Sequence, residues 1–298
     1  MTKKENILII GAGLCGSLLA LRLGQRGYNV RVVEMRPDLR KVDISAGRSI
    51  NLAFSDRGIK AMKLVGIQHK VKPLCIPMYG RMLHDKKGNT LLSNYSGRKN
   101  EYINSISRQD LTALLINEAE ALENVTFDFN KKCTNVDFEN KIATFTDYPS
   151  KEKNKISADI IFGADGAGSA LRKSYYLGKR FLFSFSQNYL SHGYKELSIL
   201  PGKNGKFKTY KNALHIWPRG DFMLIALPKG EGRGNGTGCG REEKGKEKGK
   251  KGTKKKKRKE CGQKEWKEEG KRRQKRGEEG GEKTKAAGGT GKGAPWHY

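Results

Sequence analysis

Three glycines and one acidic residue near the N-terminus have the types and spacing that bind a dinucleotide. Gly11, Gly13 and Gly16 stand in the order Gly-x-Gly-x-x-Gly, and Glu34 follows 23 positions after Gly11. In such a turn the first glycine permits a tight bend, the second lets the backbone approach a pyrophosphate, and the third lets helix and strand pack closely. The N–H groups of the following helix attract the phosphates, and a carboxylate at Glu34 can accept hydrogen bonds from both hydroxyls of an adenosine ribose.

The residues around these glycines predict the strand–helix–strand unit that such a site requires. Residues 6–10 are apolar, and Leu14, Leu18, Leu21 and Leu23 recur at helical spacing until Gly27. Residues 29–34 read as a second strand that ends at Glu34. A similar glycine turn can occur by chance in an ordinary α/β domain. The fitting element on each side and the acidic residue favour dinucleotide binding.

An Asp-Gly pair, Asp165-Gly166, is the second feature that could do chemistry. It follows residues 158–163, which predict a buried strand, and it precedes a helix that starts near Ser169. Open α/β sheets bind ligands at the carboxyl ends of their strands. The alternative is a strand-to-helix turn in which Asp165 caps the helix. This segment alone supports both interpretations equally, and the N-terminal glycines favour the ligand site.

The remaining periodicity predicts further helices and short strands. Ser55 can cap a helix over residues 56–65, and Ser107 with Asp110 resembles a capping box at the start of a second helix. Strands are predicted within residues 76–103, at 125–129, 133–138 and 141–146, and within 192–228. We therefore predict an α/β fold in which a Rossmann-like domain (residues 1–74 and 104–178) is interleaved with a mostly antiparallel substrate sheet (75–103 and 179–228).

Residues 229–298 differ in composition from the rest of the chain. The chain carries a net charge of +29, and these 70 residues hold 24 Lys and Arg, 11 Glu and 18 Gly, but no Leu, Ile, Val, Met or Phe. Such a segment cannot bury enough apolar surface to offset its ordering entropy, so we predict a disordered basic tail.

Several classes of protein and site are disfavoured by the sequence. No apolar run approaches the ~18 residues of a membrane-spanning helix, and Ile7–Ile10 is too short for a signal peptide. The five cysteines are far apart, which favours a reducing compartment, predicted to be the cytoplasm. The five histidines lack metal-ligand spacing, so no metal is predicted.

Two motifs together carry a resemblance to a known family. Gly11-x-Gly13-x-x-Gly16 with Glu34, followed by Gly163-Ala164-Asp165-Gly166-x-x-Ser169-x-x-Arg172, resembles the FAD-dependent aromatic hydroxylases of the p-hydroxybenzoate hydroxylase type. Within this family the chain is most similar to the members that act on L-kynurenine. That similarity lies in residues 47–53, 76–82, 107–108, 192–197 and 214–219, and the whole resemblance covers about residues 5–228.

The resemblance implies a flavin monooxygenase that uses FAD, NADPH and O2. NADPH reduces the flavin, a flavin C4a-hydroperoxide forms, and its distal oxygen enters the ring of L-kynurenine to give 3-hydroxykynurenine. This reaction belongs to tryptophan catabolism, toward quinolinate and NAD. Because the flavin carries the chemistry, no catalytic protein residue is expected.

The resemblance also implies roles for individual residues. The expected FAD contacts are Gly11, Gly13, Cys15 through its backbone, Gly16, Glu34, Arg36, Ala53, Arg108, Cys133 through its backbone, Asp165 and Gly166. Arg81 and Tyr95 match the pair that binds the substrate carboxylate. The plain alternatives are a solvated arginine and a packed tyrosine.

The resemblance stops at Pro228. The family's third flavin motif, a Gly-Asp-Ala segment with a following Pro and glycine turn, has no counterpart in this sequence, and neither has the terminal membrane segment of eukaryotic relatives. We interpret the abrupt change as a truncation, a frameshift or a gene-model error. We expect the chain to be incomplete, a poor FAD binder, and weakly active or inactive.

Two other functions stay open from the sequence. The first is another flavin hydroxylase or epoxidase of the same fold, which a test for kynurenine-stimulated NADPH oxidation would separate. The second is a non-enzymatic fragment whose basic run, Lys254–Lys259, binds nucleic acid without sequence specificity. We expect no specific nucleic-acid partner and no membrane partner, and flavin absorbance would distinguish the enzyme from the fragment.

Overall fold

A four-stranded parallel sheet carries the glycine motif. In the computed structural model it consists of β1 (Asn6–Ile10), β2 (Asn29–Val33), β8 (Val125–Asp128) and β12 (Ile160–Gly163), in the order β12-β1-β2-β8. The structure describes residues 5–42, 51–98, 100–178, 182–188, 197–202, 205–229 and 236–238. The predicted tail and the segments 43–50 and 192–196 therefore lie outside the described residues, apart from Lys229 and the short strand at 236–238.

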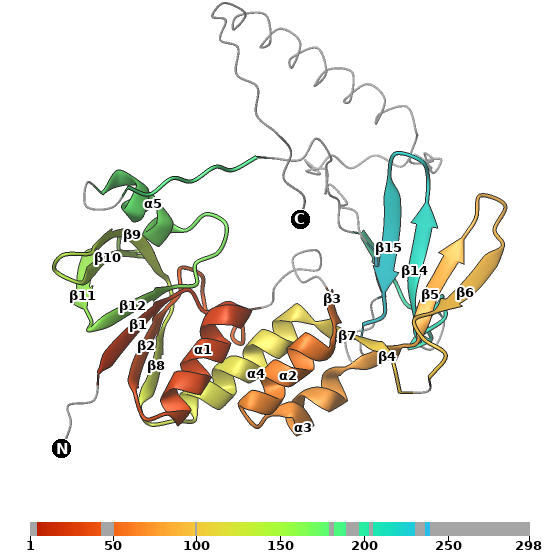
Figure 1. Cartoon of the computed structure of the whole chain (residues 1–298), viewed down its shortest axis with the longest axis horizontal. Coiled ribbons are helices and arrows are strands. Elements are labelled where there is room, and N and C mark those ends of the chain that lie inside the picture. The colour runs from red at the N-terminus through yellow and green to blue at the C-terminus, as the bar shows by residue number, and fades with distance from the viewer. Residues whose placement is uncertain are drawn as a thin grey trace, which may run out of the picture. The chain divides into compact units, whose positions relative to one another are not determined.

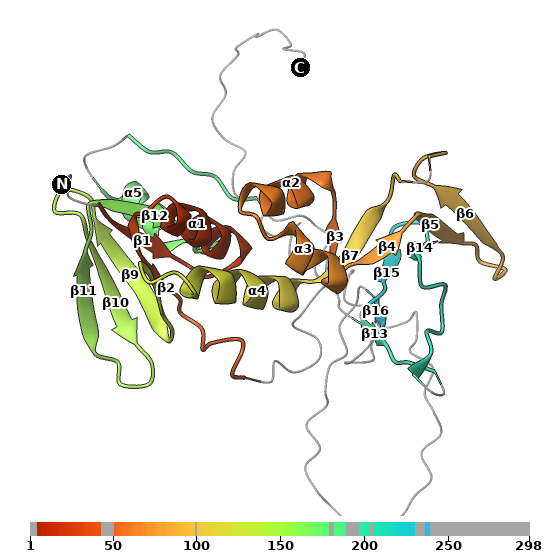
Figure 2. The same cartoon turned by 90° about the horizontal axis from the view of Figure 1, so that it is seen from below.

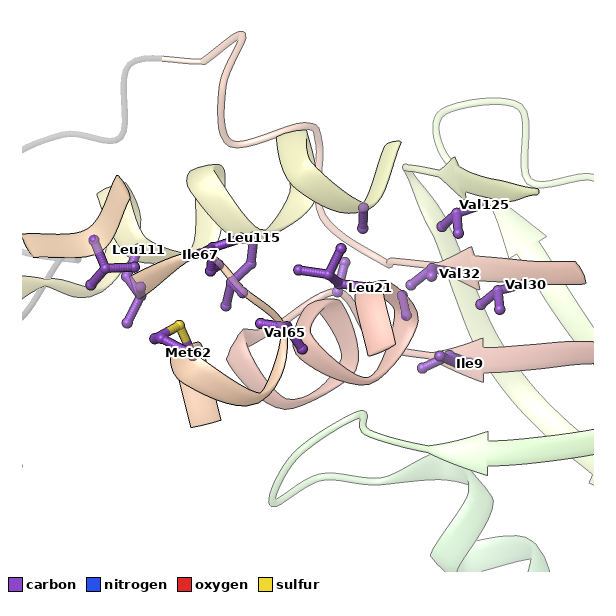
Figure 3. Close-up of a cluster of buried hydrophobic side chains, with 14 of the residues drawn as sticks. Ile9, Leu21, Val30, Val32, Met62, Val65, Ile67, Leu111, Leu115 and Val125 are labelled. Atoms are coloured by element: carbon purple, nitrogen blue, oxygen red, sulfur yellow. The ribbon is translucent and has the colours of Figure 1, made fainter. Parts of the chain in front are cut away.

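Alternate side chains of the parallel sheet enter two separate cores. One face packs against α1 (Leu14–Gln25) and α4 (Arg108–Glu120), through a cluster that includes Ile7, Ile9, Val30, Val32, Leu21, Leu115 and Val125 (Figure 3). The other face places Leu8, Ile10 and Val33 against the strands that follow β8. Because successive strand residues point to opposite faces, near-continuous apolar strands are what a sheet covered on both sides requires.

The second core is closed by a small antiparallel sheet. It contains β9 (Lys131–Asp137), β10 (Ile142–Asp147) and β11 (Lys153–Ser157), in the order β11-β10-β9. Cys133, Val136, Ala143 and Phe145 point from it toward the parallel sheet. Figures 1 and 2 show this sheet and the two helices α1 and α4 on either side of the parallel strands. Strands were predicted at residues 133–138 and 141–146, where β9 and β10 lie, whereas β11 was not predicted.

Two sequence predictions about these elements are corrected. The strand at residues 158–163 was expected to be buried, but β12 lies at the sheet edge and Phe162 is 36% exposed. β1 is the only strand paired with β12 in the described chain, so the other edge of β12 has no neighbouring strand. Ser107 accepts the predicted hydrogen bond from the N–H of Asp110 at α4, whereas Ser55 stands at the start of α2 without a side-chain cap.

The middle of the chain forms a second antiparallel sheet and three short helices. β3 (Asn51–Phe54), β7 (Ile103–Ser107) and β4 (Ile76–Met78) pair in the order β3-β7-β4. α2 (Asp56–Leu64), α3 (Gln68–Val71) and the 3₁₀ helix η1 (Lys72–Leu74) lie between β3 and β4 in the chain. Met62, Val65 and Ile67 from this stretch join the core around α4 (Figure 3).

A further sheet contains the strands predicted to bind substrate. Its order is β13-β16-β15-β14-β5-β6, from β5 (Gly80–His84), β6 (Thr90–Asn94), β13 (Leu197–Ile199), β14 (Ala213–Pro218), β15 (Met223–Leu227) and β16 (Gly236–Gly238). All its pairs are antiparallel except β14 with β5, which are parallel. The chain thus has the mixed α/β architecture predicted, while the domain boundaries stay a prediction.

α5 (Ala170–Leu177) follows β12 and packs on β9. Among the described residues, no helix is both long and apolar enough to cross a membrane.

Candidate functional site

The turn between β1 and α1 admits only glycine at two positions. Gly11 has φ +105°, and a Cβ there would stand 2.5 Å from the carbonyl oxygen of Ala164. A Cβ on Gly16 would stand 1.8 Å from the carbonyl oxygen of Gly11. The glycine turn therefore packs closely against the turn before Asp165 and against the start of its own helix. The Gly-x-Gly-x-x-Gly motif predicts such close packing.

The middle glycine has a different environment. Gly13 is the N-cap of α1, and no heavy atom of the described residues outside its own helix turn lies within 4 Å of the position where its Cβ would stand. The first backbone hydrogen bond of the helix runs from the N–H of Ser17 to the Gly13 carbonyl. The N–H groups of the residues before Ser17 therefore have no acceptor within the helix. Cys15 lies exposed in this first turn. The geometry leaves an open cradle for an anionic group.

Glu34 lies beside this cradle. Its Oε2 accepts a hydrogen bond of 2.8 Å from the N–H of Ala12, and its Oε1 accepts one of 3.0 Å from the N–H of Arg36. The Glu34 side chain is only 16% exposed, while the Arg36 side chain is largely exposed and its Nε lies 4.0 Å from the carboxylate. The carboxylate is therefore held at the glycine turn, with lone pairs left for further donors.

Asp165 is committed to the helix that follows it. Its Oδ2 accepts hydrogen bonds from the N–H groups of Ala170 and Leu171, at 2.6 and 3.4 Å. Ser169 adds a second cap by accepting from the N–H of Arg172, and Gly166 turns the chain at φ +76°. Oδ2 of Asp165 therefore caps the helix, as one of the two interpretations of the sequence proposed. Oδ1 takes no part in these hydrogen bonds.

Cys133 is buried in the second core rather than displayed at a surface. Burial, and then the nearby charge of Asp165, raise the pKa of its thiol to about 11, against a smaller opposing effect of the Asn135 backbone. Its side chain is therefore a packing group, and only its backbone remains for an adenine contact.

Ala53 and Arg108 come from the β3–β7 sheet and from the helix that follows it. Ala53 lies opposite Ser105 in the β3–β7 pair, and its side chain is exposed. Arg108 is the first residue of α4 and is also exposed. The neighbouring residues 47–50, which belong to the segment that carries the family resemblance, lie outside the described chain.

Arg81 and Tyr95 meet on one face of the substrate sheet. The guanidinium carbon of Arg81 lies 4.9 Å from the centroid of the Tyr95 ring. The Tyr95 hydroxyl is buried and has no hydrogen-bond partner among the described residues. Burial raises the pKa of this phenol, and the charge of Arg81 opposes that shift. An unpartnered buried hydroxyl beside a guanidinium fits a carboxylate, which would accept hydrogen bonds from both.

Four apolar residues that were not predicted as site residues lie on the same face of the sheet as Arg81. Arg81 is opposite Leu214, Leu83 is opposite Ile216, and Ile216 is opposite Ile225. Directly opposed residues share a face, so Leu83, Leu214, Ile216 and Ile225 extend the Arg81 face as an apolar surface. The alternating pattern of residues 213–218 was visible in the sequence, but the parallel pairing that aligns it with Arg81 was not.

A three-residue contact joins β3 and β7 to the end of β15. The carbonyl of Pro228 accepts hydrogen bonds from Nδ2 of Asn51, at 2.5 Å, and from Oγ of Ser105, at 2.6 Å. Oδ1 of Asn51 is buried and unpartnered among the described residues. Neither Asn51 nor Ser105 was predicted as a site residue, because the contact spans 177 and 123 positions of the chain.

Comparison with known proteins gives the chain a family and relatives. The family model described as FAD binding domain matches residues 4–181. Kynurenine 3-monooxygenase of Myxococcus xanthus (strain DK1622) is 44% identical over 230 residues, which are 77% of this chain and 49% of that protein. The enzyme of the same name from Anopheles gambiae is 44% identical over 223 residues, 75% of this chain and 46% of the relative. The chain thus spans about half the length of the curated relatives it matches.

Solved structures show the same fold at low sequence identity. p-Nitrophenol 4-monooxygenase PnpA from Pseudomonas putida DLL-E4 superposes with a TM-score of 0.64 at 16% identity, over 81% of this chain and 58% of that one. 2-Methyl-3-hydroxypyridine-5-carboxylic acid oxygenase gives a TM-score of 0.59 at 22% identity, over 80% and 58%.

Proposed function

This chain belongs to the family of FAD binding domains, and from that premise we propose that it is the FAD-binding and substrate-recognising part of a kynurenine 3-monooxygenase. The reaction is the hydroxylation of L-kynurenine to 3-hydroxykynurenine with NADPH and O2. The relatives at 44% identity support the name of the activity, and the Arg81–Tyr95 pair is the observation that carries the substrate assignment.

The residues of the glycine turn fit FAD. The open cradle at Gly13 and the N–H groups of the first turn of α1 would take the pyrophosphate, with Cys15 contributing its backbone. Glu34 would accept the ribose hydroxyls, with Arg36 beside it. Gly11 and Gly16 contribute by making the close turn possible.

The other expected FAD contacts stay proposals of the same kind. Arg108 would reach the phosphates, Ala53 would lie near the flavin ring, and Cys133 would offer its backbone to the adenine. The turn Asp165-Gly166 would add a contact through the carboxylate oxygen that does not cap α5. When bound, FAD supplies hydride acceptance from NADPH and the activation of O2.

The substrate residues would bind and orient kynurenine. Arg81 and the Tyr95 hydroxyl hold its carboxylate, which fixes the distance from that anchor to the aromatic ring. Leu214, Ile216 and Ile225 give the ring an apolar surface and exclude water from it. One oxygen atom of O2 enters the ring beside the amino group, and the other leaves as water at the expense of NADPH. No protein acid or base is required, because the ring recovers its aromaticity by losing a proton to solvent.

We further propose that the chain alone binds FAD weakly and hydroxylates little. The family's third flavin motif has no counterpart in the sequence, and the matched residues make up about half of each relative. The free thiols of Cys15, Cys75 and Cys133 support a reducing, cytoplasmic location. The proposed place in metabolism is tryptophan catabolism.

A chimera tests the activity. Residues 1–228 of this chain would be joined to the second half of the Myxococcus xanthus relative, at the equivalent position. We expect NADPH oxidation that L-kynurenine stimulates, with 3-hydroxykynurenine identified by mass spectrometry. The matched control is the same chimera with Arg81→Ala, which should keep its FAD and lose the stimulation. A purified, FAD-loaded chimera that oxidises NADPH at the same rate with and without kynurenine would contradict the assignment.

Another hydroxylase of the same fold is the second candidate, since structures with this fold include enzymes named for nitrophenol and pyridine substrates. A panel of aromatic amino acids and phenols in the same chimera would separate the two. Nucleic-acid binding by the basic tail concerns residues outside the described chain.

A further inference from the structure

Two histidines on the reverse face of the substrate sheet form a contact that the proposed hydroxylation does not use. Nε2 of His84, at the end of β5, lies 2.8 Å from Nδ1 of His215 in β14. Nε2 of His215 lies 2.7 Å from the backbone carbonyl of Tyr210. His215 is only 3% exposed. The His84 ring also stacks on Trp217, with the ring centroids 4.2 Å apart.

The hydrogen-bond partners decide where the protons lie. A carbonyl can only accept, so His215 carries its proton on Nε2 and donates it to Tyr210. The Nδ1 of a neutral His215 is then an acceptor, and His84 must donate to it from Nε2. In this neutral state the only ring nitrogen of the pair left without a proton or a donor is Nδ1 of His84.

This arrangement limits how many protons the pair can hold. A first added proton can enter at Nδ1 of His84 and leave both hydrogen bonds intact. A second proton could enter only at Nδ1 of His215, whose lone pair already accepts from His84. Two N–H groups would then face each other across 2.8 Å, on two adjacent cations, so the contact between the rings must break.

Burial and the Arg219 cation lower the pKa of His84 and oppose even the first proton, whereas a charge on His215 would arise only with the second. The Arg219 guanidinium donates to the backbone carbonyls of His84 and Asp85. The strands on either side offer neutral residues, with Thr90 opposite His84 and Ala226 opposite His215.

Within the part of the chain that the structure describes, no carboxylate pairs with these histidines. The carboxylate of Asp85 is used by Asn89 and by the turn N–H of Lys87. The other ionisable residues close in sequence to His84, His215 and Arg219 are Lys86, Lys87, Tyr210, Lys211 and Asp221.

We propose that His84 and His215 form a proton-limited pair that holds β5 to β14 with one proton or none and separates on the second. Arg81 lies three residues before His84 on β5 and points to the opposite face, as strand alternation requires. Separation of the rings therefore loosens the strand that carries the proposed carboxylate anchor. This last consequence, weaker kynurenine binding in acid, rests on the proposed function, whereas the proton limit does not.

The test counts protons on the rings of the full chain. In ¹⁵N-labelled protein, ring-nitrogen NMR between pH 8 and pH 4.5 reports the protonation of each histidine, with His84→Gln and His215→Gln to assign the signals. We expect one proton uptake by the pair while the β5 and β14 amide signals stay unchanged, and a second uptake only together with their loss. Uptake of two protons with unchanged amide signals would overturn the proposal.

The fluorescence of Trp217 measures the protonation of His84 independently of the NMR assignment. In the chain with Trp266→Phe and Trp296→Phe, Trp217 is the only tryptophan, and a protonated His84 stacked on it should quench its fluorescence. His84→Gln keeps a donor for His215 but cannot be protonated, so the acid quenching should be lost. His69→Gln, on exposed α3, is the matched control and should keep it. The His215 ring also stacks on Trp217, with the ring centroids 5.7 Å apart, so quenching that survives in the double variant His84→Gln/His215→Gln would contradict the proposal.

The functional consequence is measured separately, by calorimetric titration of the chain with L-kynurenine at pH 7.5 and pH 5. We expect weaker binding at pH 5 in the native chain and equal binding in His84→Gln. Equal binding at both pH values in the native chain would overturn the link to Arg81. An absence of binding at both pH values would count against the proposed function, while the proton count still decides the histidine pair.

Discussion

The guanidinium of Arg81 lies over the ring of Tyr95, 4.9 Å from its centroid, and the Tyr95 hydroxyl is buried without a hydrogen-bond partner among the described residues. A buried hydroxyl without a partner lowers the stability of the fold by about 1–3 kcal/mol, and a ligand that forms a hydrogen bond with it would remove this cost. Arg81 lies in β5 and Tyr95 directly follows the neighbouring strand β6, and the two were expected as a pair only through the family resemblance.

Tyr95→Phe should therefore have opposite effects on stability and on binding. The ligand-free chain should gain up to about 1 kcal/mol in free energy of unfolding, because the unpaired hydroxyl is removed. Binding of L-kynurenine should weaken about fivefold, because one hydrogen bond is lost. Thermal unfolding and calorimetric titration on the same preparations measure the two effects. A variant that loses stability without losing affinity would indicate that Tyr95 is a packing residue.

Arg81→Ala should weaken kynurenine binding more strongly, by about tenfold to a hundredfold, since a charge-assisted hydrogen bond contributes about 1.5–3 kcal/mol. Arg81 is exposed, so the free energy of unfolding should change little. Arg98→Ala, at another exposed arginine whose partner is Glu101, is a suitable control and should leave binding unchanged. Equal affinity in the Arg81→Ala chain would remove this residue from the proposed site.

The glycines of the first turn should separate folding from cofactor binding. Gly16→Ala places a methyl group 1.8 Å from the Gly11 carbonyl oxygen and should destabilise the chain by about 3 kcal/mol, the upper end of the usual cost of overpacking. Gly13→Ala meets no atom in the described chain and should lower the free energy of unfolding by only about 1 kcal/mol, the cost of alanine at an N-cap, yet its methyl group occupies the cradle and should weaken FAD binding. Flavin fluorescence titrations together with urea unfolding give both values. Unchanged FAD affinity in Gly13→Ala would place the pyrophosphate elsewhere.

Asp165 has two candidate roles that two substitutions can distinguish. Asp165→Ala removes one of the two side-chain caps of α5 and should lower the free energy of unfolding by about 1 kcal/mol. Asp165→Asn keeps an acceptor for the N–H of Ala170, so most of that stability should remain. If Asp165 also contacts FAD through its charge, both variants should bind FAD less tightly than the native chain. Native affinity in Asp165→Asn would restrict the residue to capping.

The free energy of unfolding should fall on acidification, over the pH range in which His84 takes up a proton. Its pKa in the folded chain is lowered from the ordinary 6.5, so the unfolded chain binds more protons and stability falls as the pH drops below about 6.5. The lowered pKa values of Asp38, Asp137 and Asp147 act below about pH 4, outside this window. Urea unfolding at pH 7.5 and 5.5 should show a smaller decrease in His84→Gln than in the native chain. An equal decrease would assign the effect to other groups.

Local patterns predicted the parts of the fold that depend on neighbouring residues. The unit β1–α1–β2 follows from the apolar run 6–10, the leucines of α1 and three glycines, and the cap at Ser107 follows from the Asp110 spacing. The edge position of β12 and the strand β11 were missed, because both depend on which strands pair across long separations. β11 is rich in lysine and lacks the apolar alternation that would mark it.

In the candidate site, too, only the features that depend on local spacing could be predicted from the sequence. Glu34 could be placed beside the glycine turn because the spacing of the unit fixes it there, although its bond to the N–H of Ala12 was not foreseen. The parallel pairing of β14 with β5 creates the histidine pair and aligns the apolar residues with Arg81. The contact of Pro228 with Asn51 and Ser105 joins residues more than a hundred positions apart. No local pattern in the sequence reports such pairings.

The most direct test of the account is a competition between nucleotides for the chain. The described residues that fit FAD, the Gly13 cradle and Glu34, would hold its ADP half, so FAD should bind saturably, although more weakly than to a full-length relative. ADP should displace it, whereas FMN, which lacks the pyrophosphate and adenosine, should not. Flavin fluorescence in the native chain and in Gly13→Ala measures this. FAD binding that ADP displaces and Gly13→Ala weakens is the predicted result. No saturable binding, or displacement by FMN as readily as by ADP, would contradict the account.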